Sequence, residues 1–253
     1  MALPHHIFDA PSGRRLAYRQ TVGSSGANFV WLSGFNSDME GSKVTELEAW
    51  AGEAGHGFTA FDYSGHGQSS GRFQDGTITH WHEDALAVLD GLTEGPQVLV
   101  GSSMGGWMAL LAARARSARV AGLVLIAPAP DFTAELMWPN LPPEAKKEIQ
   151  ETGLHMQPSD YGAPVPITRA LIDSGNQHLI FAEPFAFDGP VRILQGLQDP
   201  DVPHTHAERL VGHIRSSDLV FTLIKDGDHR LSRDQDIARL IATCGEYALA
   251  SPW

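Results

Sequence analysis

The stretch VLVGSSMGGW, residues 98–107, decides the fold class. Its first three residues are apolar and predict a buried strand, and the run 106–114 is typical of a helix. The central GSSMG fits the pattern G-x-S-x-G, in which a serine occupies a sharp turn from strand to helix. Such a turn crowds the backbone, so the flanking positions must be small, as Gly101 and Gly105 are. The pattern predicts that the hydroxyl of Ser103 projects outward as a nucleophile.

A nucleophilic serine needs a base, and the base needs an acid that orients it. In this kind of sheet the three follow in the chain order serine, acid, histidine. Asp199 follows an apolar run that ends near residue 195, and His229 follows the last such run, so we predict these two as acid and base. Asp201 in the same loop and Asp131 after the preceding run are alternative acids. Ser102 is the alternative serine, but it lacks the flanking glycines and is assigned a packing role.

Two backbone N–H groups are candidates for binding a developing oxyanion. The turn after Ser103 aims the N–H of Met104 at that position, and the start of a helix adds a favourable dipole. A second donor is expected in the loop after residues 29–32, where Gly34 permits a close backbone approach. The sequence therefore predicts Phe35 and Met104 as the oxyanion hole.

Short apolar runs alternate with helical patterns along the chain. The strand-like runs lie at residues 29–32, 58–61, 98–100, 123–126, 191–194 and 219–224. Most are apolar throughout, which is typical of parallel strands covered on both faces. A turn around residues 12–14 predicts an antiparallel pair at the start. We expect an α/β fold with a mostly parallel central sheet of about eight strands and helices on both faces.

Residues 131–188 interrupt this alternation. The segment is rich in proline and shows no convincing strand, while helices are expected at 143–152 and 167–174. We interpret residues 131–188 as a helical cap inserted into a core of residues 1–130 and 189–253. Its apolar side chains are candidates for an acyl pocket, with packing of the cap onto the core as the equal alternative; they are Trp138, Met137, Leu141, Phe181 and Phe185.

Composition excludes several classes of function. The 253 residues carry a formal net charge of -12, which disfavours nucleic acid and anionic lipid as partners. A single cysteine excludes an intrachain disulfide, and no apolar run approaches the ~20 residues of a membrane span. No signal or transit segment is recognised at the start, so we expect a cytoplasmic monomer or homodimer.

Cofactor sites are also not expected. The 12 histidines show no convincing metal-ligand spacing, so we predict no metal and no cofactor. The stretch DYSGHGQS, residues 62–69, is glycine-rich but matches no phosphate-binding pattern. We interpret it as a structural turn that braces the serine turn, and His66 within it, like His56, His80 and His82, as structural or surface residues.

Several stretches resemble one subfamily of α/β hydrolases. They lie at 61–65, 95–107 and 228–230, with 141–148 and 158–161 in the cap. The subfamily includes a mitochondrial acyl-glucuronide esterase that also acts as a palmitoyl-protein thioesterase, and its bacterial relatives. The resemblance implies the α/β-hydrolase fold and hydrolysis of esters, acyl glucuronides and thioesters, with the triad on Ser103, Asp199 and His229. The superfamily often has His-Gly where this chain has Ser33-Gly34.

The prediction is therefore a serine hydrolase acting on a small-molecule ester or thioester through an acyl-enzyme. An acyltransferase could use the same triad with another acceptor, and a carbon–carbon bond hydrolase could use the same fold. A non-catalytic binding protein is disfavoured because all three triad residues are present. Haloalkane dehalogenases and epoxide hydrolases are excluded because they need an aspartate where this chain has Ser103.

Overall fold

The computed structural model describes residues 5–24, 26–158 and 163–249. In this part of the chain, eight strands form one twisted sheet in the order β1-β2-β4-β3-β5-β6-β9-β10. Their bounds are β1 His6–Asp9, β2 Arg15–Thr21, β3 Asn28–Leu32, β4 Gly57–Phe61, β5 Gln97–Ser102, β6 Val120–Ile126, β9 Val191–Gly196 and β10 Leu219–Ile224. Only β1 and β2 are antiparallel to their neighbours, so the mostly parallel sheet and the initial hairpin are confirmed.

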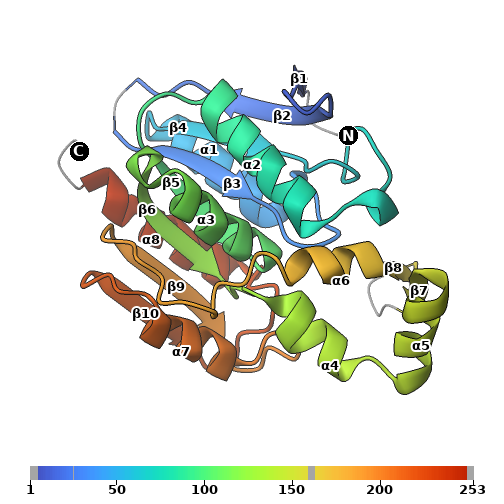
Figure 1. Ribbon diagram of the computed structural model, residues 1–253. Coiled ribbons are helices and arrows are strands. Elements are labelled where there is room, and N and C mark those ends of the chain that lie inside the picture. Colours follow the sequence, from blue (N-terminus) through green and yellow to red (C-terminus); the bar gives the residue numbers. More distant parts are fainter. Residues whose placement is uncertain (1–4, 25, 159–162, 250–253) are drawn as a thin grey trace.

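Helices cover both faces of the sheet (Figure 1). Their bounds are α1 Ser42–Glu53, α2 Ile78–Leu92, α3 Met104–Ala115, α7 His204–His213 and α8 Asp234–Leu249, with short 3-10 turns η1 Phe73–Asp75 and η2 Ser117–Arg119. The apolar sides of α2, α3 and α7 share one buried cluster, and those of α1 and α8 share the other. Strand β3 shows why residues 29–32 are all apolar. Val30 and Leu32 belong to the first cluster, whereas Phe29 and Trp31 belong to the second.

The segment between β6 and β9 lies beyond the carboxyl ends of these strands (Figure 1). It contains a π-helical turn η3 Thr133–Met137, α4 Trp138–Asn140, α5 Pro143–Thr152, β7 Leu154–Gln157, β8 Val165–Thr168 and α6 Arg169–Gly175. The segment has a small apolar core of its own; the residues are Leu141, Ala145, Ile149, Ile167 and Ile172. The helix predicted at 143–152 is confirmed.

The prediction that this segment holds no strand is wrong. β7 and β8 form an antiparallel pair, with Met156 opposite Pro166. A proline is tolerated there because, among the described residues, β7 and β8 form a sheet of two strands and β8 is an edge strand. The helix predicted at 167–174 begins at Arg169 instead, because Ile167 lies in β8 and the Thr168 side chain caps α6 by accepting the N–H of Leu171 at 3.0 Å.

Within the residues that the structure describes, no helix combines the length and the apolar character that crossing a bilayer requires.

Candidate functional site

Ser103 stands at the carboxyl end of β5, directly before α3. Its backbone adopts φ 55° and ψ -117°, a conformation that is costly for a residue with a side chain and is typically kept where function needs it. The peptide groups around it are fixed, because the Ser103 N–H donates to the Ile126 carbonyl at 2.9 Å and the Ala129 N–H donates to the Ser103 carbonyl at 3.1 Å. The predicted sharp turn between strand and helix is therefore present.

Glycine is required both two residues before and two residues after Ser103. A Cβ on Gly105 would lie 1.9 Å from the carbonyl oxygen of Leu32 in β3, and one on Gly101 would lie 2.3 Å from the carbonyl oxygen of Gly105. Both contacts are with backbone, which cannot move aside as a flexible side chain could. The close packing of the start of α3 on β3 explains why the serine is flanked by glycines.

We predict that Gly105→Ala lowers the free energy of unfolding by about 3 kcal/mol or more, because the new methyl group overlaps buried backbone. The matched control is Gly212→Ala in α7, where an added Cβ meets no atom within 4 Å. That control should stabilise the protein by up to about 1 kcal/mol, since alanine is the better helix former. Urea unfolding followed by circular dichroism measures both, and equal effects of the two substitutions would contradict this view of the turn.

The three predicted triad side chains form one hydrogen-bonded chain. The Nε2 of His229 lies 3.0 Å from the Ser103 Oγ, and its Nδ1 lies 2.8 Å from Oδ2 of Asp199. The Asp199 carboxylate is 0% exposed and the His229 side chain is 19% exposed. A carboxylate only accepts hydrogen bonds, so in a neutral imidazole Nδ1 carries the ring proton and Nε2 is left to accept from the serine hydroxyl.

Asp199 is held by its own loop. Its Oδ1 accepts the N–H groups of Asp201 at 2.9 Å and Val202 at 2.8 Å, and its Oδ2 accepts Nε2 of Gln195 at 3.1 Å as well as the imidazole. These donors satisfy the buried charge and fix the oxygen that faces His229.

The two alternative acids are placed differently. Asp131 accepts the N–H groups of Ile180 at 2.7 Å and Phe181 at 2.8 Å, so its carboxylate holds the chain where it returns to the core. Burial raises the pKa of Asp131 above its ordinary value. Asp201 is exposed, with a carboxylate oxygen within 4.8 Å of ligand atoms of Asp199 and His229. These three residues are the only potential metal-ligand cluster among the described residues, and two of them already share a hydrogen bond.

The two predicted oxyanion donors lie beside Ser103. Phe35 and Met104 both line the cavity that contains the serine. The loop of Phe35 packs on the serine turn, since a Cβ on Gly34 would lie 3.5 Å from the Ser103 Cβ. Among the described residues, neither the Phe35 nor the Met104 N–H has a hydrogen-bond partner. Both donors are therefore available to an oxyanion.

The cavity has a volume of about 830 Å³, which is within the usual range for small-molecule sites. The apolar part of its wall comes largely from the inserted segment: Phe132, Leu136, Met137, Leu141, Val165 and Ile167. The polar part comes from the loops after β3 and β10, with the start of α1: Asn36, Ser37, Asp38, Ser42, Lys43, Arg230 and Ser232. The inserted segment therefore supplies much of the apolar lining, and the loops after β3 and β10 supply much of the polar lining.

Two of the five side chains expected in an acyl pocket line the cavity. Met137 and Leu141 do so, because residues four apart in a helical stretch share a face. Trp138 follows Met137 directly and points elsewhere, with the Lys146 ammonium 5.9 Å from its ring centroid.

Phe181 and Phe185 are not in the cavity wall. The guanidinium of Arg209 lies 4.0 Å from the ring centroid of Phe181, so this ring packs on α7. Phe185 is buried in the main core, and its N–H donates to the His213 carbonyl at 3.1 Å. For Trp138, Phe181 and Phe185 the structure shows packing, which was the stated alternative.

Many cavity residues were missed in the sequence, among them Phe132, Leu136 and Lys43. Phe132 lies directly before the π-helical turn, and Leu136 lies within it. A search for the ordinary helical spacing does not predict the wider spacing of a π-helix. Their only signal in the sequence is that they are apolar residues in the connection that follows the end of β6 at Ile126. Lys43 lies at the start of α1, and its ammonium donates to the Arg230 carbonyl. Burial lowers the pKa of Lys43 to about 8.

Comparison with known proteins gives matches to hydrolases and to a hydrolase family. The Hydrolase_4 family model, described as serine aminopeptidase S33, matches residues 25–161. A bovine protein named palmitoyl-protein thioesterase ABHD10, mitochondrial, is 36% identical over 94% of this chain and 78% of its own length. Its name places that relative in mitochondria, so the cytoplasmic location expected for this chain stays a prediction.

Solved structures match over nearly the whole chain. A putative hydrolase from Agrobacterium vitis S4 superposes with a TM-score of 0.93 and 42% identity, covering 98% of this chain and 100% of the other. Mouse alpha/beta hydrolase domain-containing protein 10 gives a TM-score of 0.88 and 34% identity, covering 96% and 98%. These matches include the inserted segment as well as the sheet.

Proposed function

We propose that this chain, which belongs to the Hydrolase_4 family of α/β hydrolases, cleaves carboxylic esters or thioesters through an acyl-enzyme on Ser103. One observation carries the proposal: the Ser103 hydroxyl lies 3.0 Å from Nε2 of His229, whose Nδ1 lies 2.8 Å from the buried Asp199 carboxylate. This is the geometry that general-base activation of a serine needs.

In the proposed first step the Ser103 oxygen attacks the acyl carbonyl while its proton passes to Nε2 of His229. The carbonyl oxygen gains negative charge and accepts hydrogen bonds from the N–H groups of Phe35 and Met104. Asp199 keeps the imidazole in the required tautomer and stabilises the imidazolium. The imidazolium then gives its proton to the departing alcohol or thiol, which leaves Ser103 acylated.

In the second step water takes the place of the leaving group. His229 removes a proton from the water as it attacks the acyl carbonyl, and the same N–H groups hold the oxyanion. The proton returns from His229 to the Ser103 oxygen as the acid departs. In both steps of the proposed reaction, His229 accepts and passes on each proton.

The apolar and polar residues that line the cavity suggest how a substrate lies. We place the acyl group against the apolar wall of Phe132, Leu136 and Met137, and the leaving group toward Lys43 in the polar lining. The thioesterase name of the bovine relative supports an acyl thioester as one candidate substrate. We also propose residues 131–188 as a cap on a core of residues 1–130 and 189–253, because this segment supplies most of the apolar wall.

A substrate panel tests this proposal. Short-chain p-nitrophenyl esters, long-chain acyl thioesters and acyl glucuronides are assayed side by side, and kcat/KM ranks the substrate classes. Products are analysed with and without an added alcohol acceptor, which separates hydrolysis from acyl transfer. We expect hydrolysis of at least one class without an acceptor. Absence of hydrolysis across the panel by folded protein would overturn the proposal.

We predict that Met137→Trp shifts the preference toward shorter acyl chains. The larger ring would fill part of the cavity beside its apolar lining, and a misplaced long chain commonly costs about 1–3 kcal/mol in kcat/KM. The matched control is Met156→Trp, at an exposed residue of β7 that does not line the cavity. If both variants show the same chain-length profile with p-nitrophenyl esters, the assignment of Met137 to the acyl site is contradicted.

A further inference from the structure

The glycine-rich turn after β4 contacts the loop that carries the Phe35 N–H. The N–H of Asn36, the next residue, donates to Nε2 of His66 at 3.2 Å. On the other side of the ring, Nδ1 of His66 lies 3.2 Å from the carbonyl oxygen of Ser64. Asn36 itself has φ 54°, which is unfavourable for a residue with a Cβ unless neighbouring contacts fix it.

These two partners define the protonation of His66. A carbonyl oxygen only accepts, so Nδ1 must carry the proton, and a backbone N–H only donates, so Nε2 must be bare. His66 is 4% exposed. Burial lowers the pKa of His66 to about 4, against the opposite effects of its hydrogen bond to the Ser64 carbonyl and of the Asp84 and Asp38 charges. His66 is therefore a neutral acceptor at pH 7, and an imidazolium would turn a second N–H toward that of Asn36.

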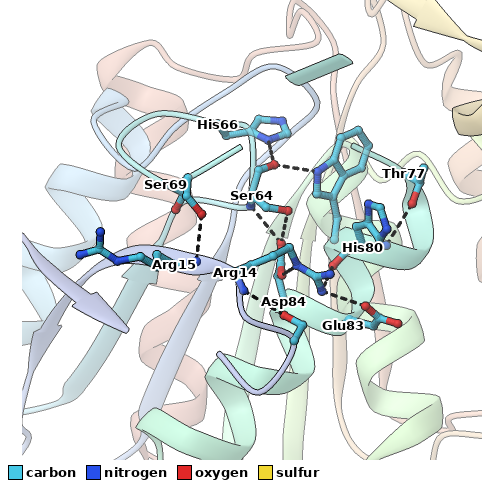
Figure 2. Close-up of polar contacts among 12 residues, drawn as sticks. Arg14, Arg15, Ser64, His66, Ser69, Thr77, His80, Glu83 and Asp84 are labelled. Atoms are coloured by element: carbon cyan, nitrogen blue, oxygen red, sulfur yellow. Dashed lines mark hydrogen bonds and ion pairs between the residues drawn. The ribbon is translucent and has the colours of Figure 1, made fainter. Parts of the chain in front are cut away.

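A buried polar network fixes the ring in turn (Figure 2). The Ser64 carbonyl also accepts Nε1 of Trp81 at 3.1 Å, and the N–H and hydroxyl of Ser64 both donate to Oδ2 of Asp84, at 2.9 and 2.7 Å. Asp84 is 0% exposed, and its other oxygen accepts Nε of Arg14 at 2.6 Å. Figure 2 shows this order from His66 through Ser64 and Asp84 to Arg14 in the initial hairpin.

The Phe35 side chain is enclosed by the same region. Its ring lies 5.0 Å from Phe73, 5.8 Å from Trp81 and 5.6 Å from Phe132, all in tilted or edge-on contact. The His66 ring also lies 5.0 Å from Phe73. The Phe35 peptide is thus held through its own side chain and through the N–H of the peptide that follows it.

We propose that His66 is a positioning residue that orients the Phe35 N–H toward the oxyanion by accepting the N–H of Asn36. The inference rests on the proposed function, because it assigns the Phe35 N–H to the oxyanion hole. His66 touches no reacting atom. Its effect is to hold the Phe35 N–H where the carbonyl oxygen of the substrate gains negative charge in the transition state.

The test compares three variants with p-nitrophenyl butyrate as the probe. His66→Leu still fills the buried site with a side chain but removes the hydrogen-bond acceptor. We therefore expect kcat to fall about tenfold to a hundredfold with KM nearly unchanged. His66→Gln can place its Oε1 where Nε2 lies and should recover most of kcat. The control is His56→Leu, a histidine with 8% exposure at the amino end of β4, away from the carboxyl edge, which should keep the kcat of the wild type.

Inhibition by a trifluoromethyl ketone separates a positioning effect on the oxyanion hole from a general loss of stability or substrate binding. It forms a tetrahedral adduct with the serine, so in His66→Leu its Ki should rise by the same factor by which kcat/KM falls. Wild-type hydrolysis together with unchanged kcat and Ki in His66→Leu would overturn the role of His66. A wild type that hydrolyses nothing and forms no adduct would instead overturn the proposed function.

A measurement on the wild type covers the case in which His66→Leu does not fold. Nitrogen-15 NMR of the histidine side chains at pH 7 should show His66 as a neutral ring with the proton on Nδ1, whereas free imidazole side chains favour Nε2. Its signal is assigned by its loss in His66→Gln. A proton on Nε2, or an imidazolium at pH 7, would contradict the acceptor role.

Discussion

Ser103→Ala is expected to lower kcat about a millionfold, to the level left by binding and oxyanion stabilisation alone. The reason is that the Ser103 oxygen is the atom acylated in the proposed mechanism, and the described cavity offers His229 no other hydroxyl at hydrogen-bond distance. Alanine avoids any new clash, because the turn already accommodates a Cβ at φ 55°.

The measurement is steady-state hydrolysis of the best substrate from the panel, with thermal unfolding as the control for folding. The melting temperature of Ser103→Ala should stay close to that of the wild type, since no described residue other than His229 hydrogen-bonds the lost hydroxyl. Activity above about 1% of the wild type in a folded variant, with contaminating esterases excluded, would contradict nucleophilic catalysis by Ser103.

Asp199→Asn is expected to lower kcat about ten-thousandfold with little effect on KM. The amide would present an N–H₂ group to Nδ1 of His229 and favour the tautomer with the proton on Nε2. That nitrogen could then no longer accept from Ser103. The amide oxygen still accepts the N–H groups of Asp201 and Val202, so the loop should keep its shape.

Asp201→Asn is the matched comparison for this prediction. Asp201 lies in the same loop, carries the same charge and was an alternative acid in the sequence, but its carboxylate is exposed. Its loss should lower kcat by less than about tenfold, as expected for an exposed neighbouring charge. A larger loss in Asp201→Asn than in Asp199→Asn would reverse the assignment of the acid.

The central part of the site could be predicted because its constraints are local. The turn around Ser103 needs a strand before it, a helix after it and glycines where backbones touch, and each of these is readable in the sequence. Asp199 and His229 could be placed because parallel strands bring their carboxyl ends to one edge of the sheet. The sequence alone offers Asp131 as an alternative acid; in the structure its carboxylate accepts the N–H groups of Ile180 and Phe181.

The wall of the cavity was harder to predict because side-chain direction there depends on tertiary packing. The expected cap extends to residue 188, but its last helix, α6, ends at Gly175. The chain after α6 then returns along the core, which is why Phe181 and Phe185 pack there and do not reach the cavity. Nothing in the local pattern marks that return.

His66 illustrates the same limit. The sequence predicts that the turn at residues 62–69 braces the serine turn and that His66 is a structural or surface residue, and the structure buries it. Its contact with Asn36 joins residues 30 apart in the chain, and only the parallel pairing of β3 with β4 brings their loops together. A sequence can show that such a histidine exists, but not which N–H it accepts.

The most direct test of the account is labelling of the wild-type protein with a fluorophosphonate probe, followed by mass spectrometry of the peptides. Such a probe modifies a serine only when that serine is activated as a nucleophile. The account predicts one modified residue, Ser103, and loss of labelling in Ser103→Ala. Absence of modification in folded wild-type protein, or a label on another residue that persists in Ser103→Ala, would contradict it.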